Sequence, residues 1–384
     1  MATGFLKFKD RFSIDIILKT SKIPVHSAYL KKKFAYRLRR IVYILILDWS
    51  FLIFFVVGFF LSSLNPVLII LSIFSLPFAL YFIYLQFIKI NTVKLQIFKI
   101  WLGEVSRSRK LCFEGTNFEK RKYMVYKQDY ENFESLLEPI KIAFVSDIHF
   151  GKSYYSCSFQ KLVRIANIIN NLPTDIFIFG GDLLCEDFCE KSFEFFDLIK
   201  KRYKFGVFGN HDSNYLKEKF SIPEEFIVKA GDVGMQILVN ESKHIEINGK
   251  KITIGGVADL RSGLFDLNKV FHTHNNESDD TLLRILVSHN PEIIDYVEEE
   301  DKIDLILSGH THWGQIRLGE GLNLYRIAPI RKYAKLLGGL YQLEFGTKIH
   351  ISSGAGTSVI RTKIGAENSV ELLELYSKKL VKNS

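Results

Sequence analysis

The sequence predicts an α/β domain built on two β-sheets and preceded by a pair of membrane-spanning helices. Between residues 141 and 308, short runs of β-branched and aromatic residues alternate with helical stretches. From residue 235 the sequence has several strand-like runs and a turn sequence typical of a β-hairpin, which favours two sheets over one. Two long apolar runs between residues 41 and 88 come before all of these elements.

The composition excludes several classes of protein. The chain has 384 residues, of which 47% are hydrophobic and 24% are charged. It is therefore too apolar for a disordered protein and long enough for one sizeable core with an accessory region. The four cysteines form no CxxC pair, so neither a zinc ribbon nor a disulfide framework is predicted, and a reducing compartment is expected.

The basic charge is concentrated in the N-terminal arm, residues 1–40. This arm has eleven Lys and Arg against two Asp, which equals the net charge of +9 of the whole chain. The net charge of the remaining residues is therefore zero. A basic domain face is not implied, and no nucleic-acid partner is expected.

Two apolar segments, 41–61 and 67–88, predict a transmembrane helical hairpin. Each can cross a bilayer, because about 20 helical residues span its hydrocarbon core of roughly 30 Å. The turn between them has no charge, whereas Lys and Arg flank their outer ends. The positive-inside rule then predicts a multi-pass protein of the inner (cytoplasmic) membrane, with both termini in the cytoplasm. The alternative is a buried helical hairpin within a soluble core.

The sequence divides into four parts. We expect a basic cytoplasmic arm at 1–40, two transmembrane helices within 41–88, a juxtamembrane linker at 89–139 and the α/β domain at 140–384. The linker contains an amphipathic stretch and several basic residues. These residues suit anionic headgroups, and they suit a solvated charged face equally well.

Within the domain, strands are predicted where short runs are rich in β-branched or aromatic residues. These runs are 141–146, 175–179, 204–208, 283–288, 303–308, 315–318, 348–352 and 370–376. Helical periodicity predicts helices at 159–172 and 191–202. Asn248-Gly249, between two strand-like segments, predicts a hairpin with a type I′ turn.

Polar residues with metal-binding side chains follow five of these strands. The segments are Ser146-Asp147-Ile148-His149, Gly180-Gly181-Asp182, Gly209-Asn210-His211-Asp212, Ser288-His289-Asn290 and Gly309-His310-Thr311-His312. Sheets of α/β proteins bind ligands at the carboxyl ends of their strands. In an extended DxH or HxH segment both side chains point to the same face, so each such segment is expected to give two ligands to one location.

This set of donors predicts a site for two divalent ions. Asp, Asn and His side chains without thiolates favour Mn²⁺ first, with Fe²⁺ or Zn²⁺ as alternatives, and argue against structural zinc. Seven ligands are too many for one ion and suit two ions that share a carboxylate, an arrangement that binds a phosphoryl group. With a bridging hydroxide the site keeps a charge of about +1, which suits an anionic phosphoester.

The five segments in this order, with the extended form Gly-His-Thr-His-Trp-Gly-Gln-Ile, resemble the calcineurin-like metallophosphoesterases over about residues 140–376. The resemblance implies an αββα sandwich, in which two packed sheets are flanked by helices. It also implies a role for each metal ligand. Asp147, His149 and His312 would hold the first ion, Asp182 would bridge, and Asn210, His289 and His310 would hold the second.

The resemblance further implies a catalytic role for His211. This residue matches the family position that hydrogen-bonds a phosphoryl oxygen or protonates the leaving group, for which an imidazole is suited. Asp212 is expected either to orient His211 or to cap a helix. Arg317, one of several basic residues after the last segment, is a candidate for binding substrate, with generic surface charge as the alternative.

A membrane anchor favours a lipid-linked substrate and a membrane lipid as partner. The sequence resembles the UDP-2,3-diacylglucosamine pyrophosphatases of lipid A synthesis, which release UMP and leave lipid X, and this activity is the first hypothesis. The alternatives are a phospholipid or other phosphodiesterase, a serine/threonine phosphatase and a nuclease. A catalytically silent scaffold is a further alternative, which the intact ligand set opposes.

Overall fold

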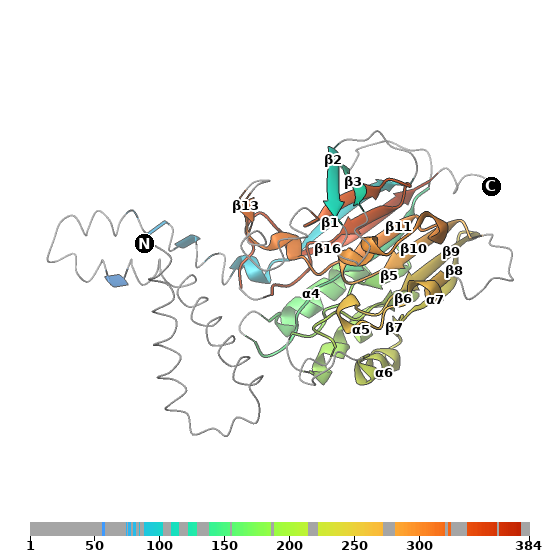
Figure 1. The fold of residues 1–384 in the computed structure, drawn as a ribbon. Coiled ribbons are helices and arrows are strands. Elements are labelled where there is room, and N and C mark those ends of the chain that lie inside the picture. The colour runs from blue at the N-terminus through green and yellow to red at the C-terminus, as the bar shows by residue number, and fades with distance from the viewer. Residues whose placement is uncertain are drawn as a thin grey trace, which may run out of the picture. The chain divides into compact units, whose positions relative to one another are not determined.

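The computed structural model in Figure 1 describes most of the chain after residue 87. The described ranges are 88–102, 109–114, 122–128, 138–153, 156–185, 188–213, 222–271, 281–318, 322–323, 336–358 and 361–377, with single positions between 56 and 84. The chain forms two units, Met1–Tyr84 and Leu85–Ser384. The basic arm and nearly all of the two apolar segments lie outside the described residues. Within the described ones, no helix has the length and hydropathy needed to cross a membrane.

A six-stranded sheet forms one layer of the second unit, in the order β1-β16-β4-β5-β6-β7. Its strands are β1 (Lys94–Trp101), β4 (Ile140–Val145), β5 (Ile176–Phe179), β6 (Tyr203–Gly206), β7 (Gln236–Ile237) and β16 (Ser369–Tyr376). From β4 to β7 neighbouring strands are parallel, as the alternation of strands and helices predicts. β16 is antiparallel to β4 and parallel to β1.

An eight-stranded mixed sheet forms the second layer, in the order β2-β3-β14-β15-β11-β10-β9-β8. Its strands are β2 (Arg109–Glu114), β3 (Lys122–Gln128), β8 (Glu241–Ile247), β9 (Lys250–Gly256), β10 (Leu283–Val287), β11 (Leu305–Ser308), β14 (Gly339–Leu343) and β15 (Lys348–Ile351). β8 and β9 form the predicted hairpin. Asn248 and Gly249 both have the left-handed backbone of a type I′ turn, with φ of 52° and 70°. A separate pair joins β12 (Arg317–Leu318) and β13 (Leu322–Asn323).

Helices lie against the outer faces of the two sheets (Figure 1). The α-helices are α4 (Phe159–Asn170), α5 (Glu194–Leu198), α6 (Glu224–Asp232) and α7 (Leu267–Phe271). Short 3₁₀ helices are η3 (Lys89–Asn91), η4 (Glu190–Phe193), η5 (Leu260–Ser262), η6 (Pro291–Asp295), η7 (Glu299–Asp301) and η8 (His312–Gly314). α4 begins at a serine cap, where the Ser158 hydroxyl accepts a hydrogen bond from the Lys161 N–H at 3.3 Å.

The core shows why these segments form two packed sheets. Along β4, Ile142 and Phe144 point into the cluster between the sheets, whereas Ala143 and Val145 point into the cluster beneath α4, α5 and α6. This alternation buries both faces of the strand. A third cluster packs the outer face of the second sheet against α7 and η6. The layers are those of the expected αββα sandwich.

Part of the segment expected to be a linker belongs to the sheets. β1, β2 and β3 all lie within 89–139, so the domain begins near residue 89 and not at residue 140. The amphipathic pattern of β1 has a period of two and belongs to an edge strand. Phe98 and Ile100 are buried between the sheets, and Leu95 and Ile97 are exposed on the other face.

Two predicted elements are shorter than expected. The helix predicted at 191–202 is divided between η4 and α5 and ends at Leu198, after which Ile199 is extended. The strand predicted at 315–318 contributes only β12, because η8 takes the chain through a 3₁₀ turn immediately before it. Neither difference moves the strand ends that carry the candidate ligands.

Candidate metal centre

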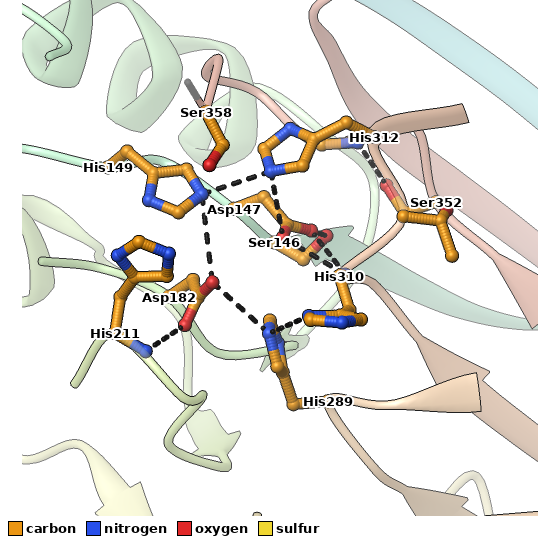
Figure 2. Close-up of polar contacts among 12 residues, drawn as sticks. Ser146, Asp147, His149, Asp182, His211, His289, His310, His312, Ser352 and Ser358 are labelled. Carbon is orange, nitrogen blue, oxygen red and sulfur yellow. Dashed lines mark hydrogen bonds and ion pairs between the residues drawn. The ribbon is translucent and has the colours of Figure 1, made fainter. Parts of the chain in front are cut away.

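The loops that follow β4, β5, β6, β10 and β11 bring their polar residues to one place at the carboxyl edge of the sheets. Figure 2 shows these side chains around a common centre, with Asp182 in the middle. Six of them are at least 92% buried and are called the Asp/His cluster. Its members are Asp147, His149, Asp182, His289, His310 and His312.

One group of potential ligand atoms contains Asp147, His149 and His312. The Nε2 atoms of His149 and His312 are 3.0 Å apart. His312 Nε2 is also 3.4 Å from Asp147 Oδ1, and His149 Nε2 is 3.6 Å from Asp182 Oδ2. Three side chains thus converge closely enough to bind one ion, and Asp182 lies beside one of them.

A second group contains Asp182, His289 and His310. Asp182 Oδ2 is 3.2 Å from His289 Nε2, which is 3.2 Å from His310 Nδ1. Because Asp182 Oδ2 faces both groups, this carboxylate stands where a bridging ligand would stand. Asn210, the remaining predicted ligand, is buried directly before His211, whose N–H donates to Asp182 Oδ1 at 2.8 Å.

The backbone at the cluster differs from the sequence prediction. Asp147 and His149 were expected to share a face because their segment was extended, and so were His310 and His312. All four instead have left-handed φ, at 53°, 54°, 69° and 49°. The side chains converge through tight turns that cost roughly 1–3 kcal/mol at each such residue.

Hydrogen bonds between loops hold these turns in place. The Asp147 N–H donates to Gly181 O at 2.9 Å, and the His149 N–H donates to Asp182 O at 3.1 Å. The His310 N–H donates to both carboxylate oxygens of Asp147 at 3.0 Å. The loops of β4, β5 and β11 therefore fix one another, and the arrangement of ligands does not depend on any single loop.

Two glycines of the motifs allow the loops to approach the carboxylates. A Cβ atom on Gly209 would lie 2.2 Å from Asp182 Oδ1, and one on Gly309 would lie 2.3 Å from Asp147 Oδ2. Neither residue could be larger without moving a carboxylate. These glycines are thus required by close packing at the site.

The protonation states suit divalent cations. Burial lowers the pKa of His149 to about 3, with a further contribution from nearby His211, and burial holds the pKa of His312 well below its usual range. Both rings are therefore neutral and have a lone pair to offer. Burial opposes the charge on Asp182, but His289 and His211 outweigh it and hold the pKa of this carboxyl well below its usual range.

The His289 ring is positively charged beside the Asp182 carboxylate, at the place where a bound cation would supply the positive charge. Burial favours its neutral form, yet the Asp182 carboxylate raises the pKa of His289 to about 10. Its Nδ1 is 2.8 Å from the carbonyl oxygen of Gly180, which leaves Nε2 facing Asp182. The residues present therefore fit a divalent cation, which would replace this proton as the partner of Asp182.

His211 lies at the half-buried rim of the cluster. Its Nδ1 donates a hydrogen bond to the carbonyl oxygen of Cys185, and its ring meets that of His149 edge-on, with centroids 4.7 Å apart. His149, Asp182 and His211 also form a third group of potential ligand atoms. The geometry is thus compatible with an acid and with a ligand at this position.

Asp212 accepts hydrogen bonds from the backbone of two loops. Its Oδ2 accepts hydrogen bonds from the N–H groups of Asp182 at 2.7 Å and Gly209 at 2.9 Å, and its Oδ1 accepts one from Leu184 at 2.8 Å. These contacts join the loop of β5 to the loop of β6. Asp212 therefore positions the segment that carries Asp182.

Two arginines lie near the motifs. The guanidinium of Arg317, the predicted substrate-binding residue, lies over the ring of Trp313 at 5.7 Å, and none of the contacts seen in the described residues joins it to the Asp/His cluster. Arg261, which sequence reasoning missed, places Nη2 2.9 Å from His310 Nε2. No strand-end motif contains Arg261, so its sequence context gave no signal.

A two-sheet α/β sandwich with clustered Asp and His side chains at the carboxyl edge defines the metallophosphoesterase class of hydrolases. The sequence model of the calcineurin-like phosphoesterases matches residues 140–314. The chain belongs to the calcineurin-like metallophosphoesterase family, and it is a hydrolase that acts on phosphoesters.

Relatives in several bacteria share the domain. The chain is 34% identical over 244 residues to the uncharacterized protein YpbG of Bacillus subtilis, covering 62% of this chain and 81% of YpbG. It is 29% identical over 257 residues to the uncharacterized metallophosphoesterase Cj0846 of Campylobacter jejuni, covering 64% of this chain and 61% of Cj0846. It is 27% identical over 251 residues to phosphodiesterase YaeI of Escherichia coli, covering 63% of this chain and 84% of YaeI.

Proposed function

We propose that the protein is a membrane-anchored phosphohydrolase with two divalent ions that cleaves a phosphodiester or diphosphate bond in a lipid-linked substrate. Mn²⁺ is the proposed metal, with Fe²⁺ and Zn²⁺ as alternatives. The catalytic domain faces the cytoplasm in this proposal. The observation that carries the lipid-linked substrate is the place where the chain enters the domain.

The chain enters the second unit at the edge that holds the Asp/His cluster. β1 is parallel to β16, which is antiparallel to β4, so the start of β1 lies at the same edge as the carboxyl end of β4. η3, just before β1, is held there by side chains. Lys161 Nζ donates to the carbonyl oxygen of Ile90 at 2.7 Å, and Asn368 Nδ2 donates to the same oxygen at 3.2 Å.

A short series of contacts connects this entry point with a candidate metal ligand. The N–H of Ser369, which follows Asn368 in the chain, donates to Gly354 O at 3.2 Å, and the Gly356 N–H donates to Asp147 O at 2.7 Å. Ile88, the last residue of the second apolar segment, is 56% exposed. An anchor that ends at residue 88 is thus attached on the catalytic edge, which favours a substrate that lies at a membrane surface.

The residues of the site have separable tasks in this function. Asp147, His149 and His312 would hold one ion, Asn210, His289 and His310 the other, and Asp182 would bridge them. Bound divalent ions polarise a phosphoryl oxygen and lower the pKa of water. His211 is anchored through Nδ1 to Cys185 O, so a proton that it gives to a leaving group must come from Nε2.

The proposed substrate is UDP-2,3-diacylglucosamine, with UMP and lipid X as products, as the resemblance of the sequence suggests. A phospholipid phosphodiester is the second candidate, and it is favoured by the name of the relative YaeI, a phosphodiesterase. Both candidates combine a phosphoanion with acyl chains. Phe188, 44% exposed on the loop that follows Asp182, offers apolar surface three residues beyond Cys185.

A substrate panel tests the proposal. Full-length protein in detergent with Mn²⁺ is incubated with UDP-2,3-diacylglucosamine, phosphatidylglycerol, cyclic nucleotides and bis-para-nitrophenyl phosphate, and Asp182→Ala is the matched control. We expect the wild type to turn over a lipid substrate faster than the soluble diesters. Turnover of soluble diesters alone would contradict the lipid-linked substrate and leave the phosphohydrolase class intact.

A further inference from the structure

Arg261 lies on a short turn that is fixed to the site from two sides. The turn is η5, which follows β9. Asp259 Oδ1 accepts the Arg261 N–H at 3.0 Å, and Gly263 ends the turn with a φ of 67°. The Leu260 N–H donates to Oδ1 of Asn290, the neighbour of His289, at 3.2 Å. The backbone of Arg261 is therefore held beside the loop that carries a candidate ligand.

The side chain of Arg261 reaches the Asp/His cluster from its solvent side. Arg261 is exposed, whereas His310, whose Nε2 is 2.9 Å from Arg261 Nη2, is 92% buried. A guanidinium is charged at every pH at which the protein is folded. A permanent positive charge therefore stands at the rim of the cluster.

If His310 binds a cation through Nδ1, its Nε2 cannot accept a hydrogen bond from Arg261. A guanidinium only donates, so His310 Nε2 must accept this hydrogen bond, and the proton of the neutral ring then resides on Nδ1. Nδ1 is the nitrogen that faces His289 Nε2 at 3.2 Å. A ring that offers the Nδ1 lone pair to a cation carries its proton on Nε2, and Arg261 must then donate to another acceptor.

We propose that this acceptor is an anionic oxygen of the substrate phosphate and that Arg261 is a substrate-binding residue. This inference rests on the proposed phosphohydrolase function. Arg261 contacts His310, and Figure 2 shows His310 and His211 on opposite sides of Asp182. A phosphate at the cluster would thus meet an arginine on one side and His211 on the other. The planar guanidinium can hold two phosphate oxygens at once, which a lysine cannot do.

The test compares Arg261→Ala and Arg261→Lys with the wild type and with Arg202→Ala. Arg202 is also an exposed arginine, and it precedes β6 at the edge opposite the cluster. Calorimetry measures the binding of inorganic phosphate to the full-length protein with Mn²⁺, and bis-para-nitrophenyl phosphate gives KM and kcat. Bound metal and thermal unfolding are measured on every variant.

We expect Arg261→Ala to weaken phosphate binding and to raise KM by about 10- to 100-fold, the usual effect of losing a charged hydrogen bond. The change in kcat should be smaller, bound metal should not change, and Arg261→Lys should recover only part of the loss. Arg202→Ala should match the wild type in all of these measurements.

Two results would overturn the inference. One is unchanged phosphate affinity in Arg261→Ala, and the other is a loss of bound metal in proportion to the loss of phosphate affinity, which would make Arg261 a positioning residue for His310. Failure of the proposed function gives a different result. The wild type would then turn over only soluble diesters, while phosphate binding would still depend on Arg261.

Discussion

His149 and His312 face each other through the same ring nitrogen, with their Nε2 atoms 3.0 Å apart across 163 residues of sequence. The rings are stacked with centroids 4.9 Å apart, and both Nδ1 atoms are buried without a hydrogen-bond partner in the described part of the chain. Two neutral imidazoles in this arrangement can share only one hydrogen bond. A cation could accept the Nε2 lone pairs of both rings at once.

Metal removal should abolish turnover. Most of the candidate ligands are histidine nitrogens, so Mn²⁺ should restore activity after chelation better than Mg²⁺, which prefers oxygen and water. Asp182→Ala should lose more activity and more bound metal than His312→Ala, because Asp182 faces both groups of ligands. Activity assays with metal analysis would check this. Full turnover in excess chelator would show that the reaction needs no ion.

Metal affinity should rise with pH. Asp182 raises the pKa of His289 to about 10 despite burial, so a cation must displace a proton from this ring at any lower pH. Each fall of one pH unit below about 10 should therefore weaken binding about tenfold. The slope should steepen below about pH 6, because burial raises the pKa of Asp147 to about 6 and the carboxylate then gains a proton as well. Competition titrations at fixed free Mn²⁺ measure the slope, and a flat profile from pH 6 to 9 would be inconsistent with this reasoning.

His211 should be separable from the metal ligands. If it acts as an acid, His211→Ala should keep its bound metal and thermal stability and lose about 10²- to 10⁴-fold in kcat. His310→Ala, the comparison variant, should lose metal as well as rate. The loss at His211 should also be smaller for nitrophenyl esters, whose leaving group needs little protonation. Loss of an ion from His211→Ala would instead make this residue a ligand, as its proximity to His149 and Asp182 also permits.

Gly354 should be intolerant of a side chain. Its φ is 75°, and a Cβ atom there would lie 2.7 Å from Asp147 Cβ. Gly249 has a similar φ of 70° but open space around it, so Gly249→Ala measures the backbone strain alone, about 1–2 kcal/mol. Gly354→Ala should reduce the free energy of unfolding by more than this and should also weaken metal binding. If Gly354→Ala and Gly249→Ala had equal effects on thermal unfolding and on metal titration, the close approach of residue 354 to Asp147 would be unimportant.

The orientation of the proposed hairpin can be tested by labelling. The turn at residues 62–65 should lie outside the cytoplasmic membrane, and the C-terminus should lie inside it. Single cysteines in this turn should react with an impermeant thiol reagent in intact cells, and a reporter fused after Ser384 should be active only in the cytoplasm. Activity of the reporter on the outer side would reverse the topology and exclude a cytoplasmic substrate.

The sequence predicted where the candidate ligands meet but not how the backbone brings them there. Strand patterns located the carboxyl ends of β4, β5, β6, β10 and β11 within a few residues, and that was sufficient to bring the six residues of the Asp/His cluster together. The left-handed turns at Asp147 and His310 were missed, since non-glycine residues rarely adopt them. They depend on hydrogen bonds between loops that are distant in the sequence.

Two other features depended on tertiary contacts that no local pattern reveals. β1 was interpreted as part of a linker, because its alternation of polar and apolar residues gains meaning only when Phe98 and Ile100 pack between the sheets. Arg261 was missed because its contact with His310 joins segments 49 residues apart. In both cases the residue types are common, and only their tertiary contacts show their role.

The pairing of β1 with β16 has a consequence for the order of events during synthesis. β1 follows the proposed anchor directly, yet its partner strand is the last strand of the domain, about 270 residues later. As the chain leaves the ribosome, β1 is synthesised long before β16, so the two strands can pair only when β16 has been made. The apolar segments before β1 are available for membrane insertion earlier. The six-stranded sheet is therefore completed only late in translation, so premature termination before residue 369 should leave a chain that can be anchored but lacks β16, the strand between β1 and β4.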